Sequence, residues 1–283
     1  MALLRLGRRS WPSYRELIDE LGGAAAALER EVTEPGGQGT LLADDPASLL
    51  AQAREEMERW AASGIRILTV LDPDYPSNLR LVHDHPPLLF VAGRLEPQDE
   101  RSVAVIGSRN ASPDGIHAAT GIARALVAGG WTVVSGLARG VDATAHTATL
   151  EAGGRTVAVI GTGLFRSYPA EHAGLQGLIA DRGAVVSQFW PDTAPSRHTF
   201  PLRNAVMSGI ARASVVVEAS QRSGARIQAR LALAHGRPVL LNQLVLAEPW
   251  ARQLANRPGV HVITDWSDIT SVVERFSDRV LTE

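Results

Sequence analysis

The sequence of 283 residues contains neither cysteine nor lysine, and all 28 of its basic residues are arginine. Without cysteine, the chain can form no disulfide and no thiolate-ligated metal centre. Without lysine, it cannot supply a Walker-type phosphate-binding lysine, a Schiff base or a lysine general base. Arginine bias in a GC-rich coding sequence is the simplest explanation for the missing lysine, but several classes of catalysis are excluded all the same.

Long apolar runs are also missing, since no stretch approaches the roughly 18 uninterrupted apolar residues of a membrane helix. The first residues, Met1 to Arg9, lack the extended apolar core of a signal peptide. We therefore expect a cytoplasmic protein without a membrane partner. Because the formal net charge is only −2, a nucleic-acid surface would have to be a local cluster of arginines.

Helical periodicity dominates the beginning of the chain. Apolar residues recur at helical spacing in residues 14–21, 24–32 and 46–62, and a Pro/Gly-rich loop lies at 34–39. Near Gly64 the pattern changes to apolar stretches typical of strands, at 65–71 and 86–93. The chain is therefore expected to contain a small helical domain, residues 1–63, and a larger domain, residues 64–283.

From Val103 onward, strand patterns alternate with helix patterns, which indicates an α/β fold with a doubly wound, mostly parallel sheet. The two earlier strands would flank this sheet. Strands are predicted at 103–106, 132–135, 157–160, 184–187, 214–218, 238–241 and 260–263. Helices are predicted at 115–128, 143–152, 173–181, 204–211, 227–235 and 267–280.

Five turn motifs follow one another within this alternating region. They are Gly107-Ser108-Arg109, Ser135 to Gly140, Gly161-Thr162-Gly163, Tyr168-Pro169 and Phe200 to Asn204. Three of them directly follow predicted strands, so they would gather at the carboxyl edge of the parallel sheet. Open α/β sheets bind their ligands at that edge.

The loops after the first two parallel strands share features that suit an anion. The amides and serine hydroxyls of residues 107–115 could hold a phosphate at a helix N-terminus, although an ordinary junction capped by Ser112 or Asp114 is the simpler explanation of this motif alone. The loop at 135–142 repeats the pattern. Together the two loops would place Arg109, Arg139 and several amides around one anion.

Two further motifs each allow two interpretations. His146, four residues after Asp142, could pair with it across a helical turn, as a structural hydrogen bond more readily than as a catalytic pair. Phe200 could stack on a base beside Arg203, although a core anchor is the simpler role. In the same motif, Asn204 is a candidate helix cap.

Other ionisable groups have simpler explanations than catalysis or metal binding. Glu218, at the end of a predicted strand, could be a general base, but a satisfied buried carboxylate is favoured. His83-Asp84-His85 offers two histidines without a third ligand, so we expect no metal.

Nine segments occur in an order that is informative when they are taken together. They are Leu71-Asp-Pro-Asp-Tyr-Pro76, Pro87 to Gly93, Val105-Ile-Gly-Ser-Arg109, Val133 to His146, Leu150 to Thr156, Gly161-Thr-Gly-Leu164, Tyr168-Pro169, Phe200-Pro-Leu-Arg-Asn204 and Val215-Val-Val-Glu218. This series resembles the DNA-processing protein A family, also called DprA or Smf. The likeness covers about residues 60 to 240, and it implies an extended Rossmann-like fold.

The resemblance also implies a function and a site. Members of that family bind single-stranded DNA in a basic pocket at the sheet edge, form dimers through the same domain and load the RecA recombinase during natural transformation. By resemblance, three arginines would contact the phosphate backbone: Arg109, Arg139 and Arg203. Close backbone approach would come from Gly107, Ser108, Ser135, Gly136, Ser223 and Gly224, and Asn204 and Arg226 complete the expected DNA-binding set. Because no catalytic residue and no cofactor is transferred, we expect a non-enzymatic protein in DNA uptake or recombination.

Departures from the family pattern lie on the pocket side. Phe165 stands where the family usually has aspartate, and Ser223 to Ala229 reads Ser-Gly-Ala-Arg-Ile-Gln-Ala where the family has Ser-Gly-Ser-Leu-x-Thr-Ala. Arg226 would then replace charge that is normally supplied elsewhere. A later glycine-rich segment is replaced by residues 242–250, and we expect no C-terminal winged helix of the kind usual in the family.

Two other function classes remain open. The fold is shared with phosphoribohydrolases and with nucleotide-sensing domains used in phage defence, so the chain could recognise a nucleotide-like small ligand. The hydrolases carry Pro-Gly-Gly-x-Gly-Thr, which residues 223–228 lack; residues 34–40 contain similar letters, but outside the sheet. The third class is a structural or partner-binding homologue that has lost the pocket.

Overall fold

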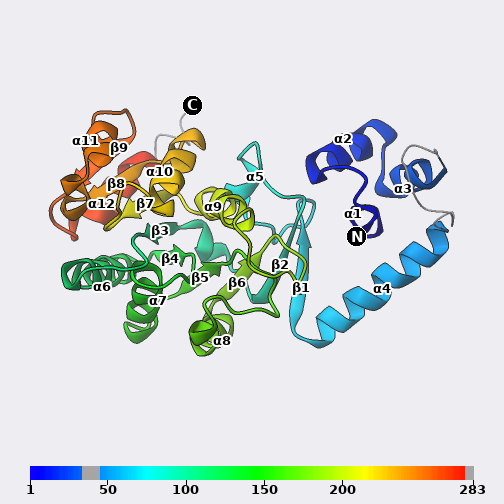
Figure 1. Ribbon diagram of the computed structural model, residues 1–283, viewed down its shortest axis with the longest axis horizontal. Helices are drawn as coiled ribbons and strands as arrows, with labels where there is room; N and C mark the ends of the chain where they lie inside the picture. Colours follow the sequence, from blue (N-terminus) through cyan, green and yellow to red (C-terminus); the bar gives the residue numbers. More distant parts are fainter. Residues whose placement is uncertain (34–44, 278–283) are drawn as a thin grey trace.

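A computed structural model of the chain describes residues 1–33 and 45–277. Within them, nine strands form one sheet in the order β1-β2-β6-β5-β4-β3-β7-β8-β9 (Figure 1). The strands are β1 (Ile65–Thr69), β2 (Leu88–Gly93), β3 (Ser102–Ile106), β4 (Thr132–Ser135), β5 (Thr156–Val159), β6 (Ala184–Ser187), β7 (Ala213–Val216), β8 (Val239–Asn242) and β9 (Val260–Ile263). The predicted α/β fold with a doubly wound, mostly parallel sheet is confirmed.

Strand pairing places a change of direction beside β3. The chain runs outward through the parallel strands β4, β5 and β6, then returns to β7, which pairs in parallel with the other side of β3. At one edge, β2 pairs antiparallel with β6 and with β1, so both early strands flank the sheet as predicted. From β3 to β8 every strand residue is buried, as expected when helices cover both faces of a parallel sheet.

The helices mostly follow the predicted pattern. They are α1 (Ala2–Leu6), α2 (Trp11–Leu21), α3 (Ala24–Thr33), α4 (Pro46–Ala62), α5 (Ser77–Arg80), α6 (Pro113–Ala128), α7 (Val141–Glu151), α8 (Ala173–Arg182), α9 (Thr199–Ile210), α10 (Gly224–Ala234), α11 (Pro249–Ala255) and α12 (Asp268–Ser277). The predicted loop at 34–39 and the end of the tail helix, residues 278–280, lie outside the described residues.

The start of α9 corrects the sequence interpretation. Asn204 is not its cap, because the helix begins at Thr199 and Asn204 lies inside it. Pro201 marks no boundary here, since the first N–H groups of a helix have no intrahelical acceptor and proline is tolerated in the first turn. Similarly, α10 begins at Gly224 instead of Ile227, because the hydroxyl of Ser223 caps it by accepting from the Ala225 amide at 3.2 Å.

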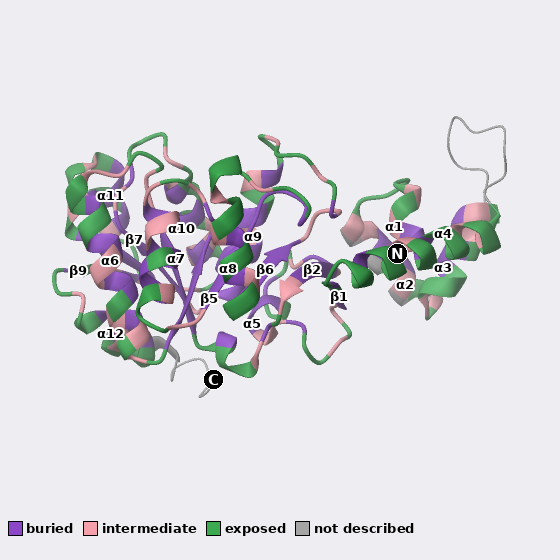
Figure 2. Cartoon of the chain, turned by 90° about the horizontal axis from the view of Figure 1, so that it is seen from below, coloured by how far each residue is buried: buried purple, intermediate pink, exposed green. Residues whose placement is uncertain are grey.

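Helices cover both faces of the sheet (Figure 1), and the strands between them are formed largely by buried residues (Figure 2). On one face, α5, α9, α10 and α11 contribute Leu79, Met207, Ala229 and Trp250 to a cluster with inward-facing strand residues. On the other, α6, α7 and α12 contribute Ile122, Leu126, Ala145 and Ile269. None of the helices in residues 1–33 and 45–277 combines the length and apolar character needed to span a bilayer.

The N-terminal helices lie beside the β1 end of the sheet (Figure 1). They share a small core of their own around Tyr14 and Leu28. Trp60 of α4 connects them to the sheet, with its ring 5.4 Å from that of Phe90 on β2, and the Arg5 guanidinium lies 4.0 Å from the centre of the Trp190 ring. Whether residues 1–63 form a separable domain stays a prediction.

Candidate functional site

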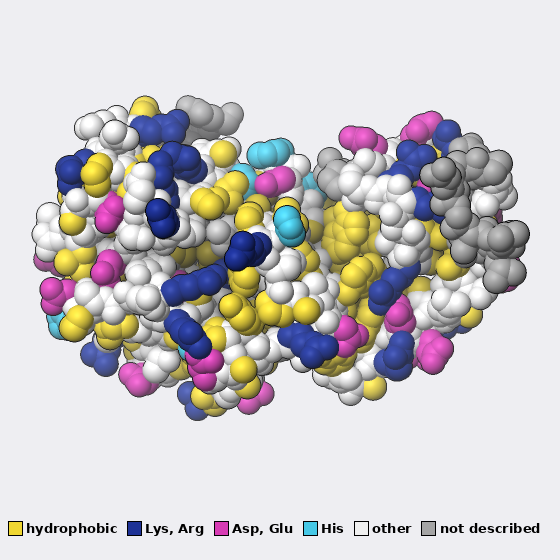
Figure 3. Space-filling view, in the orientation of Figure 1, with side chains coloured by type: hydrophobic (Ala, Val, Ile, Leu, Met, Phe, Trp, Pro, Cys, Tyr) yellow, Lys and Arg dark blue, Asp and Glu magenta, His cyan; other side chains and the backbone are white. Residues whose placement is uncertain are grey.

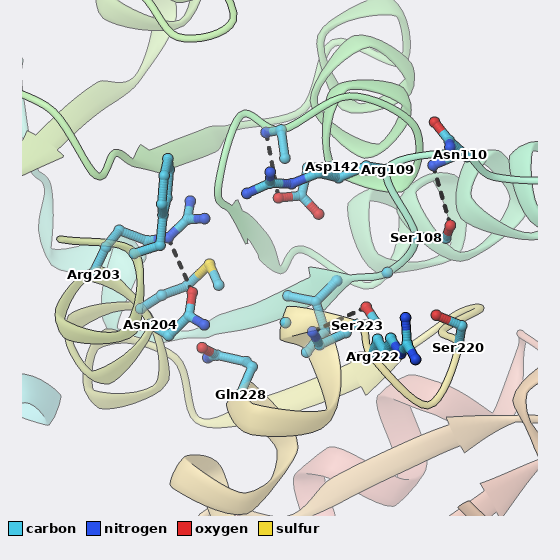
Figure 4. A pocket seen from close by; sticks show the side chains of 17 residues that line it. Ser108, Arg109, Asn110, Asp142, Arg203, Asn204, Ser220, Arg222, Ser223 and Gln228 are labelled. Atoms are coloured by element: carbon cyan, nitrogen blue, oxygen red, sulfur yellow. Dashed lines mark hydrogen bonds between the residues drawn. The ribbon is translucent and has the colours of Figure 1, made fainter. Parts of the chain in front are cut away.

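A pocket of about 430 Å³ lies at the carboxyl ends of β3, β4 and β7 (Figure 4). This is the place where the strand order reverses, and open α/β sheets bind ligands in the crevice at such a point. Its volume falls in the range of small-ligand pockets. Its lining includes Gly107, Ser108, Arg109, Asn110, Asp142, Phe200, Arg203, Asn204, Met207, Ser220, Arg222, Ser223, Gly224 and Gln228.

The loop after β3 is held in place by Glu218. The amide of Ser112 and its hydroxyl both donate to the Glu218 carboxylate, at 2.9 and 3.2 Å. Ser112 also caps α6 by accepting from the Gly115 amide at 3.0 Å. Glu218 therefore has the structural role that was the favoured interpretation, because its carboxylate is occupied by the loop that forms the pocket wall.

Arg203 supports the pocket from inside. It is only 5% exposed, and its Nη1 donates to the carbonyls of Gly136 and Val159 at 2.5 and 2.9 Å. Burial lowers the pKa of its guanidinium, and the nearby Asp142 carboxylate opposes that shift. Much of its hydrogen-bonding capacity is thus directed at the sheet, so Arg203 braces the pocket that it also lines. Its expected contact with a phosphate stays a prediction.

At Gly136 and Gly107, contacts within the protein leave no room for a side chain. A Cβ at Gly136 would lie 1.9 Å from Nη1 of Arg203, and one at Gly107 would lie 2.4 Å from the Val141 side chain. By contrast, a Cβ at Gly224 would meet no atom within 4 Å. Of these three predicted points of close approach, only Gly224 opens toward free space in the pocket.

Arg109 and Arg222 are the exposed cations of the pocket. Neither forms an ion pair with any residue in the described part of the chain, and the Arg109 guanidinium lies 5.2 Å from the centre of the Phe200 ring. A row of arginine side chains crosses this face of the molecule (Figure 3). Sequence reasoning missed Arg222, although its position directly before the cap of α10 could have indicated it.

Arg139 lines a second cavity of about 270 Å³. Its walls also include Gly136, Tyr168 and Glu171, and it shares Arg109, Phe200 and Arg203 with the first pocket. Arg139 Nε donates to the Glu171 carboxylate. This hydrogen bond raises the pKa of Arg139 and lowers the pKa of Glu171. Arg109 and Arg139 thus both line the second cavity, which adjoins the first pocket, and the two together are called the hollow below. The charge of Arg139 is partly neutralised by Glu171.

Two predicted DNA-binding residues do not line either cavity. Ser135 is buried, and its hydroxyl donates to the Val105 carbonyl at 2.6 Å, which ties β4 to β3. Arg226 donates from Nη1 to the Gln221 carbonyl at 3.4 Å. Within α10 the side chain one full turn after Gly224 is that of Gln228, so Gln228 faces the pocket and Arg226 projects elsewhere.

Gln228 is a pocket residue that the sequence interpretation did not select. It is 1% exposed, and neither its amide nitrogen nor its amide oxygen has a hydrogen-bond partner among the described residues. It points into the pocket near Asn204 (Figure 4). Buried amides that have no partner in the protein leave a donor and an acceptor available to a bound molecule.

Asp142 and His146 do not form the pair that their spacing suggested. His146 is fully buried on α7, and its Nδ1 is hydrogen-bonded to the Thr156 hydroxyl at 2.7 Å. The Asp142 carboxylate accepts instead from the Ala138 amide at 3.4 Å. Burial lowers the pKa of His146 to about 3 and raises the pKa of Asp142. The helix directs the two side chains to different partners.

The three residues of the His83-Asp84-His85 motif do not face one common point in the fold. His85 turns back to the Val82 carbonyl at 2.7 Å, whereas His83 and Asp84 meet His235 of the turn after α10. A third side chain of a type that can bind a metal therefore comes from a distant segment. No spacing rule could have paired residues so far apart in the chain.

Comparison with known proteins finds relatives that are similar in sequence and in fold. The family model described as DNA recombination-mediator protein A matches residues 66–273. Protein Smf of Synechocystis is 40% identical over 187 residues, which cover 65% of this chain and 47% of that protein. DNA processing protein DprA of Streptococcus pneumoniae is 40% identical over 171 residues, 60% of each chain. The chain thus spans about half of the length of the curated relatives it matches.

Two solved structures agree with the architecture. The X-ray structure of DprA from S. pneumoniae has a TM-score of 0.68 and 32% identity, with 81% of this chain and 82% of that chain covered. A structure of DprA from Helicobacter pylori has a TM-score of 0.66 and 25% identity over 75% of this chain and 96% of that one. That structure describes how the H. pylori protein binds single-stranded DNA. With the predicted family resemblance confirmed and the sheet-edge pocket in place, the chain belongs to the DNA recombination-mediator protein A family.

Proposed function

We propose that this protein binds single-stranded DNA along the hollow at the carboxyl edge of its sheet and acts in DNA uptake or recombination. The observation that carries the proposal is the pair of exposed arginines without ion-pair partners among the described residues, Arg109 and Arg222, on opposite walls of the pocket. Guanidinium groups bind phosphate in a planar, bidentate geometry. The Helicobacter relative, which binds single-stranded DNA, supports the same assignment.

The shape of the site favours a single strand over a duplex. Its basic groups surround a concavity, and Phe200 lies under the Arg109 guanidinium at the wall. An unpaired base can enter such a hollow and contact an aromatic face, whereas a base in a duplex is already stacked and paired. The backbone contacts carry no base identity, so most of the affinity will be independent of sequence.

A titration of labelled oligo-dT and of a matched duplex, followed by fluorescence anisotropy at several salt concentrations, tests this proposal. We expect tighter binding to the single strand, with the logarithm of affinity falling by about 0.7 per log unit of salt for each phosphate neutralised. Equal affinity for the duplex, or an affinity indifferent to salt, would contradict the proposal.

The same titration separates the DNA-binding function from recognition of a small nucleotide. Free nucleoside monophosphates should compete weakly with oligo-dT, because each offers one phosphate where the hollow can hold several. We also propose that the protein is not a hydrolase, so incubation with nucleoside monophosphates should release no free base. Release of base that Glu218→Gln abolishes would instead establish an enzyme.

We predict that Glu171→Gln strengthens binding of single-stranded DNA. The substitution removes the carboxylate that holds Arg139, and an exposed ion pair of this kind is weak and screened by salt. Affinity should therefore rise about two- to fivefold at low salt, measured by the same anisotropy titration. Glu151→Gln is the matched control, since Glu151 also faces an arginine, at 4.0 Å, but lies outside both cavities. An unchanged affinity in the Glu171 variant would show that Arg139 does not contact the DNA.

Homodimer formation and a RecA-type recombinase partner complete the proposal, and both are supported by membership of the family. Light scattering coupled to size-exclusion chromatography measures the first directly. The second is tested by whether the protein accelerates RecA filament assembly on DNA that is already coated with single-strand-binding protein. A monomer, or an unchanged rate of assembly, would remove the corresponding part of the proposal.

A further inference from the structure

Two histidines and an aspartate converge where the chain leaves α5 and where α10 ends. His83 and Asp84 belong to the turn after α5, and His235 is the C-cap residue of α10. One ligand atom from each of the three lies within 4.8 Å of the other two. In Figure 3 histidine side chains and a carboxylate lie together on the surface near α5. The cluster is separated from the pocket by the length of α10, whose first residue, Gly224, lines the pocket.

Ser208 orients the imidazole of His235. The Ser208 hydroxyl lies 3.1 Å from the Ala205 carbonyl and 2.8 Å from Nδ1 of His235. When this hydroxyl donates to Ala205, it accepts from Nδ1. Nε2 of the neutral ring then presents a lone pair, as a metal-ligating imidazole does.

Nε2 of His235 faces a carboxylate. It lies 2.9 Å from Oδ1 of Asp84, and it has no hydrogen-bond partner of acceptable geometry among the described residues. The side chain of His235 is 1% exposed. A cation beside the imidazole and the carboxylate would contact both groups at once.

We propose that His83, Asp84 and His235 bind one divalent transition-metal ion, with Zn²⁺ the ion that best fits the donors. Two imidazoles and one carboxylate, with a fourth position open to water, form a common zinc coordination set. Ser208 is the outer partner that orients the ligating imidazole. The C-terminal end of α10, with its partial negative charge, adds a favourable field for a cation.

The ion would hold together two segments that are far apart in the sequence. His83 and Asp84 are exposed and can adjust, since the ligands of a tetrahedral zinc ion lie roughly 3.3–3.5 Å apart at metal distances of about 2.1 Å. Arg237 opposes the ion electrostatically, but its Nη2 is directed away to the Asn78 carbonyl at 3.0 Å. We therefore expect binding to stabilise the fold without contributing to the pocket.

The test uses the full chain without a polyhistidine tag, stripped of metal by chelator and dialysed at pH 7.5. Titration with ZnCl₂ by calorimetry should give one site per chain, and metal analysis after desalting should retain close to one zinc. The melting temperature should rise by several degrees with zinc, because a ligand that binds only the folded state stabilises it. Affinity for oligo-dT should be unchanged by zinc.

His83→Ala is the decisive variant. The contact between His235 and Asp84 does not involve His83, so this variant removes a proposed metal ligand and leaves that contact in place. We expect zinc affinity to fall at least tenfold. His198→Ala removes an exposed histidine outside the cluster and should bind zinc like the wild type. No zinc at one equivalent in the wild type, or full zinc binding by His83→Ala, would reduce the cluster to a hydrogen-bonded ion pair and overturn the proposal.

Discussion

Acidification from pH 6.5 toward pH 3 should lower the free energy of unfolding by on the order of 4 kcal/mol through His146 alone. Burial lowers the pKa of this residue from 6.5 to about 3 in the folded protein. In the unfolded chain the imidazole takes up a proton near pH 6.5, whereas the folded protein resists protonation until about pH 3. Each unit of difference corresponds to about 1.4 kcal/mol. The stability is therefore fully present above pH 6.5 and is lost as the pH falls.

The hydrogen bonds around His146 explain this resistance. The Thr156 hydroxyl donates to the Val133 carbonyl at 2.7 Å, so it can only accept from Nδ1 of His146. A second proton would have to reside on Nε2, which has no hydrogen-bond partner among the described residues. A buried imidazolium with an unsatisfied N–H is costly.

Urea unfolding of the wild type and of His146→Asn between pH 7.5 and 4.5 measures the effect. Asparagine keeps a donor toward Thr156 and does not titrate, so this variant will be less stable at pH 7.5 but should show a flatter dependence on pH. The comparison of slopes removes the contributions of the other histidines and of Asp142, whose pKa burial raises. Parallel slopes in the two proteins would show that His146 is not the origin of acid sensitivity.

Replacement of Arg109 by alanine should weaken binding of single-stranded DNA about 5- to 150-fold. Charge-assisted hydrogen bonds of this kind are worth about 1–3 kcal/mol, and every 1.4 kcal/mol is about a factor of ten in affinity. The side chain is exposed and has no ion-pair partner in the described part of the chain, so its loss leaves no buried charge behind. The melting temperature should change little.

Arg124→Ala is the matched control, because Arg124 is an exposed arginine of α6 that lies outside both cavities. Its affinity for oligo-dT should equal that of the wild type. The salt slope should also decrease by about 0.7 in the Arg109 variant if one phosphate contact is lost. A variant that unfolds would mark Arg109 as structural, and an unchanged affinity would place the DNA elsewhere.

The architecture could be predicted from the sequence because the strands have a characteristic apolar composition. Val103–Ile106 and Val133–Val134 are rich in β-branched residues and buried on both faces, and such runs between helical segments predict a parallel sheet with little ambiguity. Helix starts were less accessible. The beginning of α9 was placed five residues late because Asn204 resembles a helix cap, although the helix begins at Thr199 and tolerates Pro201 in its first turn.

The site was predicted in position more than in detail. Strand ends located the loops with Arg109 and Ser223 correctly at the pocket. That Arg203 turns inward could not be predicted, because it depends on the carbonyls of Gly136 and Val159 at the ends of two other strands. Long-range contacts of this kind leave no local pattern in the sequence.

Because the chain returns to pair β7 with β3, the pocket is completed late during synthesis of the chain. One pocket wall comes from residues 107–142 and another from residues 200–228, and they face each other only after β7 has paired with β3. While the chain is emerging from the ribosome, β3 to β6 can already be folded with β3 still lacking its second neighbour. A nascent chain that ends before β7 therefore has one wall of the pocket, and Arg222 arrives only with the last part of the site. Binding capacity should thus be acquired late, as one step, when the second half of the sheet docks.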